Sequence, residues 1–416
     1  MEQIGSNTAV KAHFMIRDLS VKLVAASVIA MSVFGLLIRQ FAKAGNMVDL
    51  MMIFIGIFAV SNLLKSDFKV RRDQLIILLM LATLSLSLAV SLMLNRRVTG
   101  LVQFVLYAAY LAPLLLVQKI SSRDAYRVFL PLFVIIGVLQ LPADLLFPNL
   151  DEHVLDMYSG TFQIANNKSR FLFLVLLASI FVYWGCKGRS RVLLLFSILA
   201  MLFSFKLGDS MFVYIFGAVS LLLGLFHRRK YVALGLALML VFGIYYILDA
   251  YSDEPYVVFI FHRFFDAEHG AVAVVNYGFH LLKESYWMGS GLGEFISRAS
   301  QSMGGLYVNQ IPRTMVTYGK IYEETVAPTG LPAYVSIITE AGAAGIALSA
   351  FLIVYLYKNS FHSFAGFASF IYVLLLSMFI PMFYEGPDGA IFLYAYVLIN
   401  KALRHRDELL TATEAQ

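Results

Sequence analysis

Long apolar runs, separated by short polar loops, dominate the pattern along the chain. The runs "LVAASVIAMSVFGLLI" (23–38), "LIILLMLATLSLSLAVSLML" (75–94) and "VLLLFSILAMLF" (192–203) carry no charged residue. A helix needs about 20 such residues to cross a bilayer, and it satisfies its own backbone polar groups there. The residue-by-residue alternation that marks a membrane β-barrel is absent. The pattern therefore predicts an all-α, polytopic integral membrane protein.

Counted by length, the apolar runs predict about twelve membrane-spanning helices. They are expected near 19–38, 47–64, 74–94, 98–117, 126–147, 170–186, 191–207, 210–226, 231–249, 331–357, 361–380 and 388–403. The chain thus divides into an N-terminal transmembrane bundle of about nine spans (1–249), a large loop (250–330), and about three C-terminal spans with a tail (331–416).

Basic residues in the short loops predict the orientation of these spans. The loops "KSDFKVRRD" (65–73) and "HRRK" (227–230) and the tail "NKALRHRDE" (400–408) fall on one side if the spans alternate. That side is expected to be cytoplasmic, because basic loops stay inside. Both termini are then cytoplasmic and the large loop is outside. Two expected outer loops, with Arg39 and Lys43 and with Arg96 and Arg97, depart from the pattern.

Composition supports the membrane reading and excludes other classes. Charged residues make up 14% of the chain and hydrophobic residues 60%, whereas a soluble domain carries about 25% charged residues. The net charge of +6 lies in loops between apolar runs, so nucleic acid is not an expected partner. The single cysteine, Cys186, excludes an internal disulfide and a cysteine-based metal site.

The large loop contains a predicted amphipathic helix, "AVAVVNYGFHLLKESY" (271–286). Its apolar stripe has helical spacing, so we expect it to lie on the membrane or to cap a cavity. Three glycines follow in "GSGLGEF" (289–295). A nucleotide-type phosphate loop needs a preceding strand and a Gly-Lys-Ser/Thr ending, and both are missing. A helix end followed by a flexible turn is the simpler interpretation.

Two stretches resemble a known family. "KESYWMGSGLGEF" (283–295) followed by "APTGLPAYVSIITEAGAAGIAL" (327–348) is similar to the paired signature of the O-antigen polymerase and ligase superfamily. This superfamily contains Wzy-type polysaccharide polymerases and WaaL-type ligases. In its pattern the chain re-enters the membrane with a tyrosine, a glutamate and two glycines, which here are Tyr334, Glu340, Gly342 and Gly345. The His-Asn pair of the ligases is replaced by Leu331 and Pro332, which favours a polymerase.

The resemblance implies an enzyme at the outer face of the bacterial inner membrane. Such an enzyme transfers one glycan from undecaprenyl diphosphate to a hydroxyl of a second lipid-linked oligosaccharide, without cofactor or metal. Expected partners are the lipid-linked oligosaccharide, membrane lipids, a chain-length regulator and a flippase. The product is left open between O-antigen, capsule and exopolysaccharide.

Other functions stay open on the sequence alone. A ligase would transfer the glycan to lipid A core. A lipid-linked glycan flippase or transporter also fits twelve spans, although the large loop and the missing internal repeat count against it. A glycosyltransferase with an acidic pair in its first outer loop fits poorly, because "RQFAKAGN" holds no acid. A scaffold without enzyme activity is the remaining class.

The leaving diphosphate defines the chemistry that site residues must supply. Its developing charge is stabilised best by fixed cations, and arginine binds phosphate oxygens with two parallel donors. By resemblance, Arg263 in "FHRFFDAEHG" is the first candidate for this contact, although it also suits a role at the lipid headgroups. Arg313 comes second, and the remaining basic candidates are Arg298 and Lys320.

Three further candidates lie in or beside predicted spans. Glu340 falls inside a span, where an unpaired charge costs about 2.5–3.5 kcal/mol, so we expect it to be a catalytic base or to have a partner. Lys206 in "SFKLGDS" either contacts substrate or pairs with Asp209. Tyr334 is a candidate substrate contact by resemblance. For Gly342 and Gly345 the alternative role is close helix packing.

Overall fold

The computed structural model describes the chain in separate stretches, which consist mainly of helices joined by turns, with one short hairpin. The described residues are 19–33, 45–64, 72–148, 161–162, 165–184, 186, 188–208, 211–227, 229, 232, 235–236, 239, 243, 271–295, 297, 299, 303–307, 315–317, 320–322, 333–360, 363–377 and 386–414.

The helices follow the apolar runs of the sequence. The elements are a first helix (Leu19–Ser32), α3 (Gly45–Leu64), α4 (Arg72–Asn95), α5 (Val98–Leu111), α6 (Leu114–Lys119), α7 (Ser122–Asp124), a π turn η1 (Ala125–Phe129), α8 (Leu130–Leu146), α9 (Ala165–Tyr183), α10 (Gly188–Leu207), α11 (Met211–Gly224), α14 (Ala271–Glu284), the strands β1 (Met315–Thr317) and β2 (Lys320–Tyr322), α16 (Ala333–Ala341), α17 (Ala343–Asn359), α18 (Phe364–Ser377) and α19 (Pro387–Glu414). The strands form an antiparallel hairpin that pairs Thr317 with Lys320.

Within the residues that the structure describes, five helices are long and apolar enough to cross a membrane. They are Met47–Leu64, Arg72–Asn95, Val98–Lys119, Ser122–Leu146 and Gly188–Leu207. The spans expected near 47–64, 74–94, 98–117, 126–147 and 191–207 are therefore confirmed as helices of sufficient length. Large apolar side chains on α10, such as Leu193, Phe196 and Phe203, are exposed, as expected for a surface that contacts lipid. The total of about twelve spans stays a prediction.

The span predicted as one helix over 331–357 is instead two helices. The first, α16, ends at Ala341, and α17 begins at Ala343. Between them Gly342 has φ +60°, a left-handed conformation that glycine adopts without steric cost. The prediction of continuity was wrong because an apolar pattern does not register a break of one residue.

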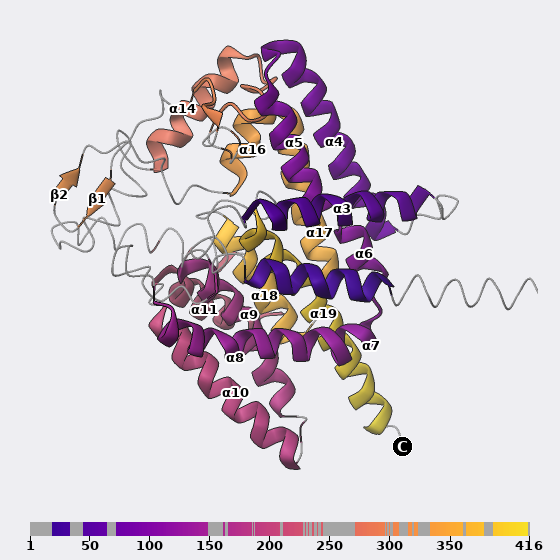
Figure 1. The fold of residues 1–416 in the computed structure, drawn as a ribbon. Coiled ribbons are helices and arrows are strands. Elements are labelled where there is room, and N and C mark those ends of the chain that lie inside the picture. Colours follow the sequence, from indigo (N-terminus) through magenta and orange to yellow (C-terminus); the bar gives the residue numbers. More distant parts are fainter. Residues whose placement is uncertain are drawn as a thin grey trace, which may run out of the picture.

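The helices do not all share one direction. Figure 1 shows α4, α5 and α17 running together on one side of the molecule with α3 lying across them, while α8 crosses the lower part of the molecule, where it packs against α9 and α10. The buried core centres on α19, which packs against α9 and the η1 turn. Its fully buried tyrosines donate to backbone carbonyls, Tyr394 to Tyr110 and Tyr396 to Leu356, each at 2.8 Å. These contacts hold the C-terminal helix against segments from both halves of the chain.

Candidate functional site

Residues 285–295, which follow α14, form a tight turn that we call the glycine loop. The chain reverses there through five residues with positive φ, namely Tyr286, Trp287, Gly289, Gly291 and Gly293. Left-handed tyrosine and tryptophan are uncommon, and such strain persists only where surrounding contacts hold it. In Figure 1 the loop joins the end of α14 to the region beside α16 and the α4–α5 turn.

Glu340, near the end of α16, holds the glycine loop through backbone amides. Its carboxylate accepts hydrogen bonds from the N–H groups of Gly293 (2.8 Å), Phe295 (3.0 Å) and Ser297 (3.2 Å). The residue is 1% exposed. A buried carboxylate is stable when several N–H donors surround it. The expectation that Glu340 needs a partner is thus met by the loop backbone.

Backbone contacts join the same two segments. The Ser290 N–H donates to the Thr339 carbonyl at 2.8 Å, and the Gly291 N–H donates to the Glu340 carbonyl at 3.0 Å. The Ala343 N–H, at the start of α17, donates to the Trp287 carbonyl at 3.0 Å. The stretches 283–295 and 327–348, which carry the family resemblance, therefore meet in space where the structure describes them.

Close backbone approach explains why glycine occupies this junction. A Cβ added at Gly342 would lie 2.5 Å from the Met288 carbonyl carbon, and one at Gly293 would lie 2.5 Å from the Thr99 carbonyl oxygen. Distances under about 3 Å leave no room for a side chain, and the positive φ adds strain. The glycines therefore serve as packing positions.

A second buried carboxylate, Glu294, fixes the other side of the loop. It accepts from Arg97 Nη1 and the Leu306 N–H, at 2.9 and 2.8 Å, and from the Thr99 hydroxyl. Its side chain is fully buried, whereas Arg97 is 36% exposed. Asn95, at the end of α4, donates to the Ser290 carbonyl at 2.7 Å. The α4–α5 turn is thereby tied to the glycine loop across nearly two hundred residues of sequence.

The residues of this second anchor were missed at the level of sequence. The sequence distinguishes Arg97 only as a basic residue in an expected outer loop, against the charge pattern of the other loops. Glu294 lies inside the quoted "GSGLGEF", and an acid between glycines and an apolar run is a signal that could have located it. Gln103, a polar residue within the apolar α5, accepts from the Ala299 N–H at 2.9 Å. A polar residue inside a predicted span is the sequence feature that could have located Gln103.

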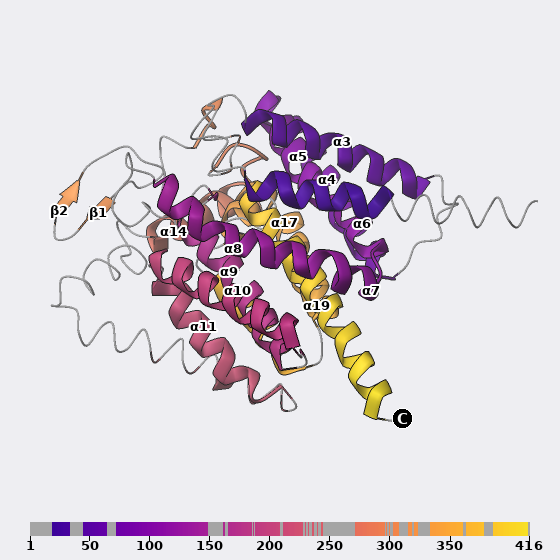
Figure 2. The same ribbon diagram turned by 60° about the horizontal axis from the view of Figure 1, so that its bottom comes forward.

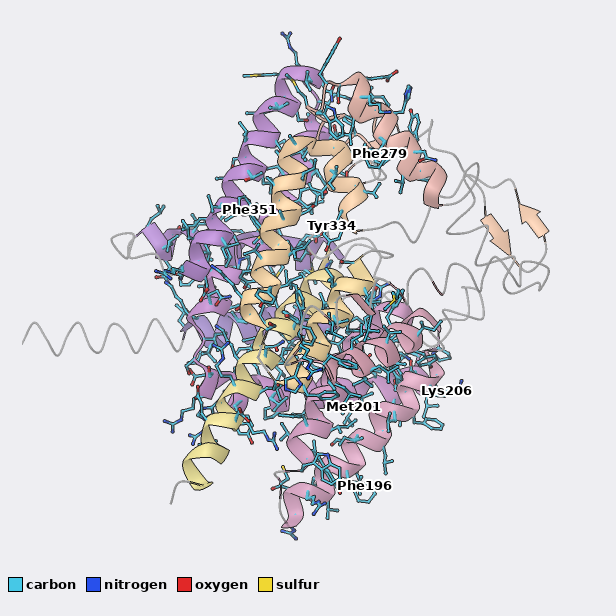
Figure 3. All side chains as sticks on the ribbon, turned by 180° about the vertical axis from the view of Figure 1, so that it is seen from behind. Phe196, Met201, Lys206, Phe279, Tyr334 and Phe351 are labelled. Carbon is cyan, nitrogen blue, oxygen red and sulfur yellow. The ribbon has the colours of Figure 1, made fainter. Side chains whose placement is uncertain are left out.

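The amphipathic helix α14 caps the glycine loop. Its Val274 and Leu281 pack with Phe295 in a small buried cluster, and the Tyr277 ring lies 6.2 Å from that of Phe295. Burial, with Tyr307 nearby, raises the pKa of Tyr277. Phe279, labelled in Figure 3, is 49% exposed on the same helix. The part of the apolar stripe that contains Val274 and Leu281 therefore packs against protein, and the capping of a cavity stays a prediction.

The other described candidates lie apart from the glycine loop. Tyr334, in the first turn of α16, donates its hydroxyl to Ser377 Oγ of α18 at 2.6 Å. Lys206 lies at the end of α10, with its ammonium 5.9 Å from the centre of the Tyr214 ring. Figure 3 shows Lys206 on the α10 side of the molecule, well away from Tyr334. These two candidates are therefore not brought together.

Four candidates cannot be placed by their side chains. Arg263, Arg298 and Arg313 lie outside the described residues, as does Asp209, the predicted partner of Lys206. Of Lys320 only the backbone is described, in the β1–β2 hairpin. Their roles stay predictions.

The described arrangement is an anchored loop with two internal carboxylates. Both carboxylates are engaged by donors of the protein, so the geometry gives them a positioning role; the catalytic role predicted for Glu340 stays a prediction. In the part of the chain that the structure covers, no three His, Cys, Asp or Glu side chains gather as metal ligands. A scan of protein-family models found no match to the chain, and a search of curated proteins found no significant similarity.

Proposed function

We propose that the protein is a membrane-embedded glycosyltransferase that polymerises lipid-linked oligosaccharides. The observation that supports this most is the junction between the glycine loop and α16. The two stretches that resemble the polymerase and ligase superfamily are far apart in sequence, yet Glu340 and three amides of residues 293–297 join them. The five long apolar helices supply the membrane setting that a polyprenyl carrier requires.

In the proposed reaction, an acceptor hydroxyl attacks the anomeric carbon of the donor glycan. The bond from that carbon to the diphosphate oxygen breaks as the new glycosidic bond forms, and undecaprenyl diphosphate leaves. The hydroxyl proton passes to a base, and cations stabilise the charge on the leaving diphosphate. Arg263 is the proposed diphosphate contact, with Arg313 as the second, and the substrates approach from the outer face of the inner membrane.

The junction would position these groups without taking part in the chemistry. Loop residues 285–295 are held by α16 on one side and by the α4–α5 turn on the other. The ends of the segments that flank this loop are therefore fixed in position. Rigid support of this kind lowers the entropic cost of aligning two large substrates.

A reconstituted assay tests the proposal. The purified protein is placed in liposomes with a lipid-linked oligosaccharide, without nucleotide sugar or divalent metal, and products are sized on gels. We expect longer glycans on the carrier. Translocation without lengthening would instead identify a flippase, and transfer only to lipid A core would identify a ligase.

Arg263→Ala is the diagnostic variant in the same assay. It should lower the rate of lengthening by more than about 100-fold, because a charge-assisted contact to the leaving group is lost. Arg404→Ala, at an exposed position of α19, is the matched control and should lengthen glycans at the rate of the unchanged protein. Normal polymer from well-expressed Arg263→Ala protein would remove Arg263 from the mechanism.

A further inference from the structure

The first turn of α9 gathers a second group of polar side chains inside the helical bundle. Lys168 and Ser169 are fully buried there. Lys168 Nζ donates to both Asp144 carboxylate oxygens at 2.9 Å, and Ser204 Oγ donates to the same carboxylate at 2.6 Å. These contacts join α8, α9 and α10, which also lie together in Figure 2. The ion pair neutralises Lys168.

Two buried hydroxyls, one next in sequence to Lys168 and one on α18, which packs against α9, have no hydrogen-bond partner in the described structure. They are Ser169 Oγ of α9 and Tyr372 Oη of α18. Six tyrosines in the described part of the chain are fully buried, and Tyr372 is the one whose hydroxyl lacks a partner there. Buried polar groups are normally paired, because leaving one unpaired costs free energy. A ligand that accepts hydrogen bonds would remove this cost.

One positive side chain, Arg170, lies near these hydroxyls. Arg170 follows Ser169 directly, and its charge acts on the Tyr372 phenol. The Tyr372 ring packs at 4.1 Å from Phe173, one helical turn after Ser169. The N-terminal end of the 19-residue helix α9 adds the positive end of its dipole. The chain at Gly208, after α10, packs closely against the Ser169 hydroxyl, because an added Cβ there would meet Ser169 Oγ.

We propose that Ser169, Arg170 and Tyr372, together called the α9 cluster, form a binding site for a phosphate-type oxyanion. The two hydroxyls donate to anion oxygens, the Arg170 guanidinium supplies paired donors, and the helix end favours negative charge. Such an anion could come from a lipid diphosphate headgroup or from free phosphate. The inference rests on its own contacts, so it holds or fails independently of glycan polymerisation.

Binding is measured directly on the full-length protein. Calorimetric titrations use inorganic pyrophosphate with the protein in detergent, and farnesyl diphosphate with the protein in nanodiscs. Tyr372→Phe and Ser169→Ala should each weaken binding about tenfold, because each removes one hydrogen bond to a charged group. Ser179→Ala is the control and should bind as the unchanged protein does, since Ser179 is an equally buried and unpaired serine of the same helix.

A second measurement separates ligand binding from a structural role. Without ligand, Tyr372→Phe should unfold at the same temperature as the unchanged protein or higher, because it removes an unpaired polar atom. Binding of both probes supports a site for free anions, and binding of the lipid probe alone supports a headgroup site. Binding of neither probe, equal affinity of Tyr372→Phe and the unchanged protein, or a lower unfolding temperature of that variant would each overturn the proposal.

Discussion

At the scale of single residues, the substitution Glu340→Gln replaces one carboxylate oxygen by an NH2 donor. We expect this change to weaken the contact between α16 and the glycine loop. In Glu340→Gln the side-chain NH2 would face backbone N–H donors that now bind a carboxylate oxygen. We expect the free energy of unfolding to fall by about 1–3 kcal/mol, the cost of buried groups left unpaired. Denaturant titration of the detergent-solubilised protein measures this change.

Glu284→Gln is the matched control for this substitution. Glu284 lies at the end of α14, where its exposed side chain pairs with His280. Its variant should stay within about 0.5 kcal/mol of the unchanged protein. If the two variants were equally stable, the three amide contacts of Glu340 would contribute nothing measurable.

Sequence reasoning could locate Glu340 but could not name its partners. An acid in an apolar run must be paired, and that requirement follows from the cost of burying a charge. Its three donors are main-chain N–H groups, which every residue except proline carries. No side-chain pattern therefore distinguishes residues 293–297 as the partner, and only the fold brings them to α16.

At the scale of secondary-structure elements, the break between α16 and α17 gives a direct prediction. Gly342→Ala should destabilise the protein strongly, because the new Cβ meets the Met288 carbonyl carbon at 2.5 Å and the residue has φ +60°. Gly304→Ala has the same type of positive φ, +73°, with nothing within 4 Å of the added Cβ. In this control variant, stability should fall only by the cost of backbone strain, about 1–2 kcal/mol. Thermal unfolding in detergent compares the two variants.

Similar losses in both alanine variants would contradict the packing argument. They would mean that backbone strain alone accounts for glycine at position 342. A larger loss at Gly342 would show that close contact with the Met288 backbone is what requires glycine.

The apolar runs predict where the helices lie along the chain, but they do not predict the directions in which the helices run. The helices α3, α4 and α10 lie where uninterrupted apolar residues were expected, since length and hydrophobicity are local properties. The crossing of α5 by α3, seen in Figure 1, depends on side-chain packing between distant segments. Charge in the loops predicts which side a loop occupies, and it says nothing about the angle between helices.

At the scale of the whole molecule, the proposed function requires the glycine loop to face outward. The chain has one cysteine, Cys186, so Cys186→Ser gives a background for labelling. Tyr286→Cys places a thiol at a side chain that is 87% exposed, and Arg404→Cys places one at an exposed position near the C-terminus. A membrane-impermeant maleimide added to spheroplasts should label the first and leave the second unlabelled until the membrane is opened.

The reverse labelling pattern would place the glycine loop in the cytoplasm. Lipid-linked repeat units await extension on the outer face, so the proposed polymerase would then fail. The oxyanion site at α9 would be unaffected, because its test measures binding to the purified protein.

The order in which the carboxylate and its amides are synthesised has a consequence for biogenesis. Glu340 follows Gly293 by 47 residues and Ser297 by 43. At about 5–20 residues per second, the loop amides leave the ribosome roughly 2–10 seconds before the carboxylate that binds them. During that interval the nascent loop must stay hydrated or be shielded by the insertion machinery. Premature termination between these positions would therefore release a chain whose loop cannot close, a natural target for membrane quality control.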